Sequence, residues 1–187
     1  MKNTKVIAAF PACGKTYCFD RNDDYVVLDS DSSKFSWMLR KRTDEELEME
    51  RKAWDFEKHK MPGSMYIKQI KDELIKVRNP EFPKNYIDHI KENIGKVDYI
   101  FVSTHEEVRK ALAEADIDFT LVFPQQALRA EWVGRCFIRG SGEKFCQMIA
   151  DQWDDWILKM EEEVVYNNRK HYRLKSNEYL SDALDHI

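Results

Sequence analysis

The stretch AFPACGKT, residues 9–16, decides which fold we expect for this chain of 187 residues. It continues an apolar run at residues 6–10, which predicts a short buried strand, and a helix can begin directly after it. The stretch matches the phosphate-binding pattern G-x-x-x-x-G-K-[ST], except that Ala9 stands in place of the first glycine. We therefore predict a strand, a phosphate-binding loop and a helix; the alternative is a solvated turn that happens to contain Gly-Lys-Thr.

Each residue type in this loop serves the binding of a phosphate group. Successive backbone amides would curl round the anion, and the positive end of the following helix would point at it. Gly14 lets the main chain approach closely because it has no Cβ. The Lys15 ammonium would reach the β- and γ-phosphates, and the Thr16 hydroxyl is placed to bind Mg²⁺. The predicted nucleotide-binding residues are Pro11, Ala12, Cys13, Gly14, Lys15, Thr16 and Tyr17.

The composition fits one folded domain with room for a helical insertion. The chain is 43% hydrophobic and contains 5 tryptophans, as expected of a globular protein. Its net charge of −4 argues against a protein built mainly to grip a nucleic-acid backbone, although a local basic groove stays open. We find no apolar run of membrane-spanning length and no signal peptide, so we expect no membrane partner, reduced cysteines and a cytoplasmic location (the host cytoplasm if the chain is phage-encoded).

Two aspartates follow the second predicted strand, at residues 25–28. Asp29 and Asp31 would lie at the carboxyl end of that strand, where ligands bind in open α/β sheets. Carboxylates at this place suit Mg²⁺, a substrate hydroxyl, or both. The alternative is that they cap the next helix, since aspartate is a good N-cap residue.

Residues 35–94 are predicted to be helical throughout. Thr43 and Glu46 form a capping box for a helix that reaches about residue 60, and apolar residues up to position 77 keep helical spacing in the next helix. This length exceeds what one crossover between strands requires, which indicates an inserted helical subdomain at 34–95. The basic cluster around Arg40 would meet an anionic acceptor, or it is simply a solvated surface.

The second half of the chain alternates strands and helices. We predict strands at 97–102, 119–123 and 171–174, and a capping box formed by Thr104 and Glu107. We expect Ser176 or Asn177 to cap the last helix. His105 follows the third strand of the sheet and is either an acceptor-binding residue or an ordinary surface histidine.

A helix at about 125–138 contains several arginines and leads to a glycine-rich joint. Arg135 and Arg139 lie four residues apart and can share one helix face, directly before Gly140-Ser141-Gly142. Arginines beside a hinge suit a lid over a transferring phosphoryl group, which we place at about residues 129–145. The alternative is a surface salt bridge between Glu131 and Arg135. The next helix carries an aromatic stripe that we interpret as core.

This series of elements resembles the small P-loop kinases, the superfamily of nucleoside monophosphate kinases and shikimate or gluconate kinases. The segment at 123–140 also looks like that of short nucleotide-kinase-like proteins of bacteriophages. The resemblance implies a three-layer α/β P-loop fold. Its five-stranded parallel sheet would have the order 2-3-1-4-5, with a helical acceptor-binding insertion and an arginine lid.

The resemblance also implies roles for single residues. Lys15 and Thr16 would hold ATP and Mg²⁺, and Asp29 resembles the family's metal-side aspartate or base. Since no aspartate ends the third strand, where many P-loop proteins hold the metal, Asp29 is the predicted substitute. Arg135 and Arg139 resemble the catalytic lid arginines. The predicted acceptor-binding residues are Asp31, Arg40, His105 and Arg129.

The sequence therefore predicts an ATP- and Mg²⁺-dependent phosphotransferase. We expect a nucleotide or nucleoside kinase that acts on a small (deoxy)nucleotide-type acceptor. One alternative is a kinase that acts on a hydroxyl, either of a small metabolite or of a modified base in DNA; Asp29 and Asp31 favour it, because carboxylates repel an acceptor phosphate. Another is a nucleotide-binding module or ATPase that transfers nothing to an acceptor.

Overall fold

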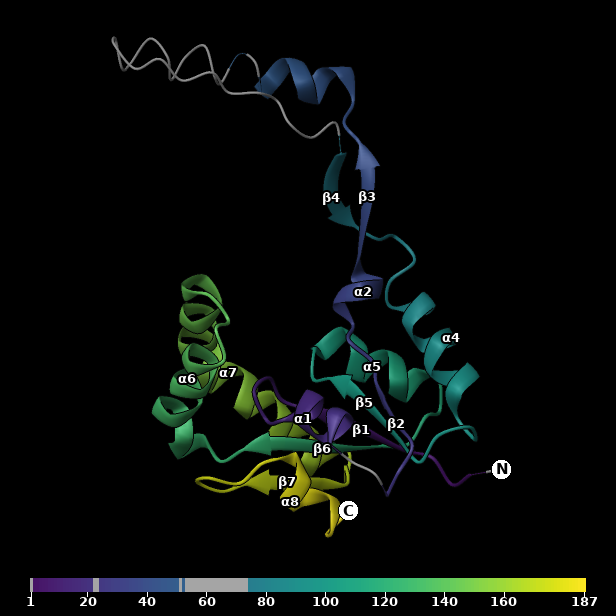
Figure 1. Ribbon diagram of the computed structural model, residues 1–187, viewed down its shortest axis with the longest axis vertical. Coiled ribbons are helices and arrows are strands. Elements are labelled where there is room, and N and C mark those ends of the chain that lie inside the picture. The colour runs from purple at the N-terminus through teal and green to yellow at the C-terminus, as the bar shows by residue number, and fades with distance from the viewer. Residues whose placement is uncertain (1, 22–23, 51, 53–73) are drawn as a thin grey trace. The chain divides into compact units, whose positions relative to one another are not determined.

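The computed structural model describes residues 2–21, 24–50, 52 and 74–187 (Figure 1). The chain divides into two compact units. The sheet unit comprises Met1–Ser32 and Pro83–Ile187, and the hairpin unit comprises Ser33–Phe82. The predicted insertion, by comparison, covered 34–95.

The sheet unit is built on a five-stranded parallel sheet in the order β2-β5-β1-β6-β7. Its strands are β1 (Lys5–Ala9), β2 (Val27–Asp29), β5 (Tyr99–Ser103), β6 (Phe119–Pro124) and β7 (His171–Leu174). If only these five strands are numbered, the order is 2-3-1-4-5, which confirms the predicted sheet. The carboxyl ends of β1 and β5 are neighbours, because Ala9 pairs with Ser103.

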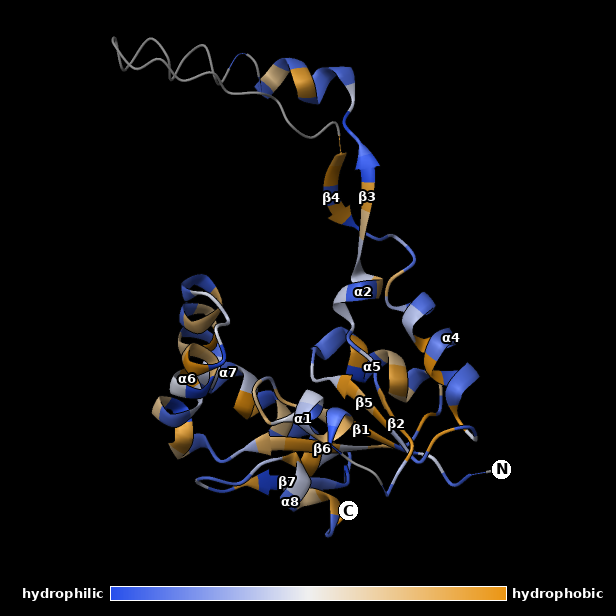
Figure 2. Cartoon of the chain, in the orientation of Figure 1, coloured by the Kyte–Doolittle hydropathy of each residue, from blue (hydrophilic) through white to orange (hydrophobic). Residues whose placement is uncertain are grey.

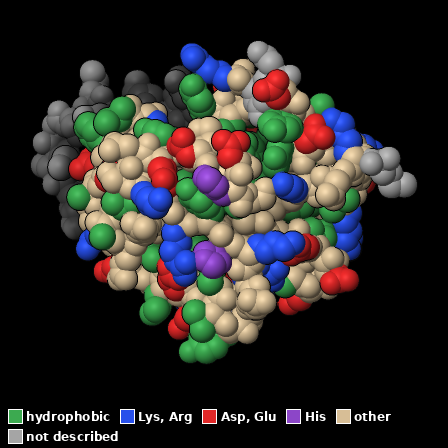
Figure 3. Space-filling model, turned by 90° about the horizontal axis from the view of Figure 1, so that it is seen from below, with side chains coloured by type: hydrophobic (Ala, Val, Ile, Leu, Met, Phe, Trp, Pro, Cys, Tyr) green, Lys and Arg blue, Asp and Glu red, His purple; other side chains and the backbone are tan. Residues whose placement is uncertain are grey.

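The core of the sheet unit consists of nearly continuous apolar strands. Apart from the first residue of β1, the last of β5 and the second of β6, every residue of these three strands is buried. They are among the most hydrophobic segments in Figure 2. Strands of this kind are typical of a parallel sheet covered on both faces. The face in Figure 3, in contrast, mixes basic and acidic side chains.

Helices complete the sheet unit. They are α1 (Lys15–Asp20), α4 (Lys84–Asn93), α5 (Glu106–Glu114), α6 (Arg129–Ile138), α7 (Glu143–Tyr166) and α8 (Leu180–Leu184), with a short 3₁₀ turn at Gln126–Leu128. α1 packs against α8, α4 against α5, and α7 against β6. The crossovers β1–α1–β2 and β5–α5–β6 run in opposite directions across the sheet, so right-handed connections place α1 and α5 on opposite faces.

The hairpin unit contains strands that were not predicted. After the short helix α2 (Ser33–Ser36), β3 (Trp37–Lys41) pairs antiparallel with β4 (Leu74–Arg78). The prediction of helix throughout residues 35–94 is therefore wrong at these two segments. The capping box is confirmed, since the Thr43 amide donates to Glu46 Oε2 and the Glu46 amide donates to Thr43 Oγ1. A helix follows at residues 44–50, and most of the helix predicted from residue 64 lies outside the described residues.

The predicted N-cap residues of two helices, α5 and α8, are wrong. His105 is the N-cap of α5 and its side chain makes no cap hydrogen bond, so Thr104 and Glu107 form no capping box. Tyr179 precedes α8, and its amide donates to Asp182 Oδ2 at 2.7 Å. Within the described ranges, no helix combines the length and the apolar character that a membrane span needs.

Candidate active site

The loop at residues 9–16 makes a sharp bend between β1 and α1. Ala12 has a φ of 60° and Gly14 a φ of 95°, so the chain enters the left-handed region twice within three residues. A Cβ on Gly14 would meet Tyr179 Cδ1 at 3.4 Å. That distance is an ordinary contact, so it is the left-handed conformation that requires Gly14.

Lys15 closes this loop on itself. Its Nζ donates to the carbonyl oxygen of Ala9 at 2.6 Å and to that of Phe10 at 3.2 Å. The ammonium group thus reaches back across the bend to the end of β1. The positive charge is thereby held beside the backbone of the bend.

Other elements hold two more carbonyl groups of the loop. Trp132 Nε1 on α6 donates to the Pro11 oxygen at 2.9 Å, and the Leu180 amide donates to the Cys13 oxygen at 2.8 Å. Within the described part of the chain, the amides of residues 12–16 donate to no backbone carbonyl outside a helix. Trp132 and Leu180 thus hold the bend in place, and the amides of such a bend are the groups that bind anions in known phosphate-binding nests.

Thr16 and Asp29 form the candidate metal site. Thr16 Oγ1 donates to Asp29 Oδ2 at 3.0 Å, although the two residues come from α1 and β2. A hydroxyl and a carboxylate are hard oxygen donors of the kind that Mg²⁺ prefers. Among the described residues, no group of three or more His, Cys, Asp or Glu side chains is arranged to hold a metal. Thr16 and Asp29 therefore fit an ion that takes its remaining ligands from phosphate and water, as Mg²⁺ usually does.

Buried polar groups surround the carboxyl ends of β2 and β5. Tyr86 on α4 is fully buried, and its hydroxyl donates to the Ser30 carbonyl at 2.6 Å. Burial raises the pKa of Tyr86. The hydroxyl oxygens of Ser30 and Ser103 are buried without a hydrogen-bond partner. Asp31 is exposed next to this group, so polar atoms from three elements gather at this edge beside Asp29.

The predicted lid arginines differ in their surroundings. The side chain of Arg135 is only 10% exposed, and its guanidinium lies 4.0 Å from the Trp132 ring centroid and 4.2 Å from that of Tyr179. Its nitrogens donate to the Glu178 carbonyl at 2.8 Å and to Glu131 Oε1 at 2.5 Å. Arg135 thus clamps α6 to the loop between β7 and α8.

Arg139 is exposed at the end of α6, and its Nε donates to the Ser141 hydroxyl. Burial raises the pKa of the Cys13 thiol, while the positive charges of Lys15 and Arg139 partly oppose this effect. Arg139 therefore lies close enough to the 9–16 loop for its charge to be felt there. Its guanidinium carbon is 5.4 Å from the Phe145 ring centroid.

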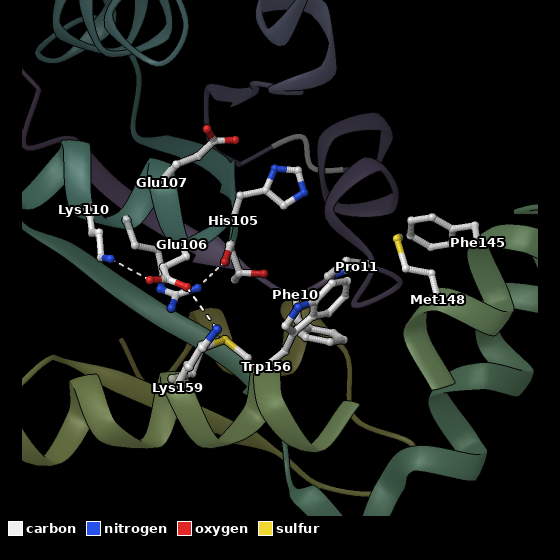
Figure 4. Close-up of a pocket in the computed structure, with 13 residues that line it drawn as sticks. Phe10, Pro11, His105, Glu106, Glu107, Lys110, Phe145, Met148, Trp156 and Lys159 are labelled. Atoms are coloured by element: carbon white, nitrogen blue, oxygen red, sulfur yellow. Dashed lines mark hydrogen bonds and ion pairs between the residues drawn. The ribbon is translucent and has the colours of Figure 1, made fainter. Parts of the chain in front are cut away.

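A pocket of about 430 Å³ opens beside the start of the loop (Figure 4). It lies between the first turn of α5 and the facing side of α7. Phe10, Phe145 and Trp156 supply aromatic walls, and His105 and Glu107 extend from the start of α5. The combination of aromatic surface with a few polar groups is typical of small-molecule sites.

Ion pairs fix the polar side of this pocket. Glu106 accepts from Lys110 at 2.6 Å and from Lys159 at 3.3 Å, and these two cations lower its pKa. Arg109 is buried and its Nε donates to Glu163 Oε1 at 2.7 Å. The pairs Glu106–Lys159 and Arg109–Glu163 join α5 to α7 beside the pocket.

The structure brings together some of the predicted site residues but not all. Thr16 lies beside Asp29, and Tyr17 follows as an exposed residue on α1. His105 lines the pocket, whereas Arg129 is exposed at the start of α6. Arg40 belongs to the hairpin unit, where its guanidinium donates to both oxygens of Glu46 at 2.6 and 2.7 Å.

Four aromatic residues of the site were not predicted. Trp132 and Tyr179 support the loop, Tyr86 supports the edge beside Asp29, and Trp156 was interpreted only as core. Each lies on an amphipathic helix or at a helix start. An aromatic residue at such a position fits the apolar pattern of the helix equally well whether it fills a core or lines a site.

Comparison of the chain with protein-family models, with curated proteins and with solved structures finds no match. What is established is an α/β domain with a five-stranded parallel sheet and an antiparallel hairpin. The function is therefore argued from the site itself.

Proposed function

We propose that the chain is an ATP- and Mg²⁺-dependent phosphotransferase, with a nucleotide or nucleoside as acceptor. The observation that carries the proposal is the 9–16 loop, which enters the left-handed region at Ala12 and Gly14 and is closed by the Lys15 ammonium. A triphosphate tail would replace the two carbonyls as the partner of Lys15. The β- and γ-phosphates would then accept hydrogen bonds from the loop amides and lie next to the Lys15 ammonium.

Thr16 and Asp29 would hold the metal ion. Bound there, Mg²⁺ would neutralise charge on the β- and γ-phosphate oxygens. The hydrogen bond of 3.0 Å between their side chains already places both oxygen donors at one point. The chain's own contribution is to fix these donors at the mouth of the loop.

In the proposed reaction, an acceptor oxygen attacks the γ-phosphorus. The bond between that phosphorus and the β–γ bridging oxygen breaks, and the nucleoside diphosphate leaves with the electron pair. Lys15 stabilises the charge that develops on the leaving oxygen. Arg139 would offset charge on the transferred group, while Arg135, which is held by its neighbours, would position α6.

We place the ring of the acceptor in the pocket beside Phe10. A volume of about 430 Å³ lies within the range of small-molecule sites, roughly 300–1,000 Å³. Phe145 and Trp156 offer apolar faces against which a planar base can pack. His105 and Glu107 could then hydrogen-bond the edge of that base.

A second candidate is transfer to a hydroxyl group instead of to a phosphate. Asp29 and Asp31 favour it, because two carboxylates near the loop would repel an anionic acceptor but could accept a hydroxyl proton. In this version, the proton of the acceptor passes to a carboxylate as the new P–O bond forms.

Incubation with γ-labelled ATP and Mg²⁺ distinguishes these readings. The purified chain is given separate panels of deoxynucleoside monophosphates, nucleosides and DNA oligonucleotides that contain a hydroxymethylated base. Label on a monophosphate supports the first proposal, and label on a hydroxyl supports the second. Release of free phosphate with no labelled acceptor would instead indicate an ATPase.

Two substitutions test the site itself. Lys15→Ala should lower the transfer rate by roughly 10²- to 10³-fold, because a fixed electrostatic donor is lost. Thr16→Ala should raise the Mg²⁺ concentration needed for half-maximal rate by about tenfold or more, and Thr16→Ser, which keeps the hydroxyl, should restore it. Lys91→Ala, on the exposed surface of α4, serves as the control. Unchanged turnover in Lys15→Ala would overturn the assignment.

A further inference from the structure

The β3–β4 hairpin has one face that its strand register defines. Trp37 pairs with Arg78, Leu39 with Lys76, and Lys41 with Leu74. Side chains of directly opposite residues share a face, and alternate residues along a strand do so too. We call this set the basic face, and all six of its residues are exposed.

The basic face carries positive charge without compensation from its own strands. It contains Lys41, Lys76 and Arg78, and neither β3 nor β4 contains an acidic residue. The remaining cation of the two strands, Arg40, alternates to the other face, where Glu46 binds it in two hydrogen bonds. Arg40 and its partner Glu46 therefore belong to one face of the hairpin, and Lys41, Lys76 and Arg78 belong to the other.

An aromatic ring lies among these cations. Trp37 is 42% exposed. Lys76 Nζ is 5.3 Å from its ring centroid and the guanidinium carbon of Arg78 is 5.7 Å from it. A large exposed aromatic residue bordered by cations is a combination that indicates a binding surface.

Protection of the sheet edges explains only part of this pattern. Lysines on an edge strand prevent edge-to-edge pairing with other chains. That role would be served by charged residues alone and does not require an exposed tryptophan between them. The whole chain has a net charge of −4, so a cluster of three cations on one face is opposite in sign to the chain as a whole.

We propose that the basic face binds single-stranded nucleic acid. An unpaired nucleotide offers a ring beside a phosphate, and this face offers an aromatic ring beside cations. A base would stack on Trp37, while Lys41, Lys76 and Arg78 would contact neighbouring phosphates. A duplex is disfavoured, because its bases are already stacked on one another and leave no ring for Trp37.

The proposal goes beyond the phosphotransferase and does not depend on it. It assigns a polynucleotide partner to the hairpin unit and requires neither ATP nor the 9–16 loop. Binding is therefore measured without nucleotide, and a failed kinase assay leaves it unaffected.

The test measures the affinity of the full chain for a fluorescein-labelled oligo(dT) by fluorescence anisotropy at several salt concentrations. Three phosphate contacts predict a slope of log K against log[salt] of about −2, since each contact contributes about −0.7 on a single strand. Lys76→Glu with Arg78→Glu should weaken binding at least tenfold and make the slope shallower. Trp37→Ala should weaken it by about tenfold, and Trp37→Phe, which keeps a ring, should retain most of the affinity.

The matched control is Lys91→Glu with Lys96→Glu. These lysines are exposed on the sheet unit, so the control changes the net charge by the same amount elsewhere. It should leave the affinity within about twofold of the unchanged chain. Thermal unfolding of every variant by circular dichroism verifies that the fold is kept.

Several results would overturn the proposal. These are no binding at 50 mM salt, an equal loss in the control pair, or affinity for a duplex of the same length as strong as for the single strand. Binding to phosphatidylglycerol vesicles without binding to the oligonucleotide would identify a lipid surface as the partner instead.

Discussion

Gly14 and Gly134 have opposite structural requirements, although both lie close to the candidate site. Gly14 has a φ of 95°, a conformation that is strained for any residue with a Cβ. Gly134 lies within α6, and a Cβ there would meet nothing within 4 Å. The same change to alanine should therefore have opposite effects at the two positions.

We predict that Gly14→Ala lowers the free energy of unfolding by about 1–2 kcal/mol, because a left-handed conformation is costly for any residue with a Cβ. Gly134→Ala should raise it by about 0.5–1 kcal/mol, since alanine loses less backbone entropy in a helix. Urea denaturation measures both values. Equal effects of the two substitutions would mean that Gly14 does not adopt the bend described above.

At the scale of single residues, the sequence is informative where a binding site requires a particular type of side chain. The pattern in residues 9–16 is specific enough to find Lys15 and Thr16, and Asp29 followed from its place after a strand. Trp132 and Tyr179 could not be found, because any of several apolar residues can occupy such positions. Only their distances to the loop reveal that they support it.

At the scale of elements, α6 joins the 9–16 loop to the segment that follows β7. Glu131 on α6 accepts from the Ser176 hydroxyl at 2.8 Å, from the Asn177 amide at 3.0 Å and from Arg135 at 2.5 Å. Partial burial raises the pKa of Glu131, but these hydrogen bonds outweigh it and hold the pKa below its ordinary value. The ionised form is thus favoured by folding.

The lowered pKa of Glu131 predicts how the stability of the fold depends on pH. A carboxyl whose pKa is lowered on folding stabilises the protein fully above its ordinary pKa, and that stability is lost as the pH falls through the lowered value. Glu131→Gln should therefore cost about 1–3 kcal/mol at pH 7, and the difference from the unchanged chain should shrink between pH 5 and pH 3. Denaturation at a series of pH values measures it. A difference that stays constant would contradict the prediction, and exposed Glu162→Gln is the control.

The hairpin was not predicted because the apolar residues of β4 fit both the helical period of 3.6 and the strand period of 2. Leu74 and Val77 are three residues apart, which suits the helix expected from residue 64, but Ile75 and Val77 also alternate with exposed residues. β3 contains no β-branched residue, so its composition does not indicate a strand. The two strands are also far apart in the chain, which removes the short-turn signal that identifies most hairpins.

At the scale of the whole molecule, the sheet unit contains its own core. Among the described residues, none of the buried hydrophobic side chains lies between 37 and 78. The hydrogen bond from the Asn79 amide to the Ser36 oxygen, at 3.0 Å, brings the two ends of this segment together. Two glycines can therefore replace residues 37–78 without strain, because two-residue turns join such ends.

We predict that this shortened chain still unfolds in one cooperative transition and binds ATP, but no longer binds single-stranded DNA. Differential scanning calorimetry and isothermal titration with ATP and Mg²⁺ measure the first two properties, with the full chain as reference. A shortened chain without a cooperative transition would show that the sheet unit depends on residues 37–78.

The order of the sheet could be predicted at this scale because strands, loop and crossovers obey general rules of connection. The proposed acceptor could not be predicted, since its identity would depend on how a few side chains such as His105 and Trp156 line one pocket. The fold is encoded by pattern, whereas the specificity of a site is encoded by its shape.

The central place of β1 affects when the sheet can form as the chain is synthesised. This first strand is flanked by β5 and β6, which the ribosome delivers much later, and residues 33–82 delay them further. Until both neighbours arrive, the segment after β1 has no partners to bend it, and closing so long a loop is entropically slow. The nucleotide site proposed above would therefore form only after β5 and β6 have been synthesised, and nucleotide binding would draw the last steps of folding toward completion.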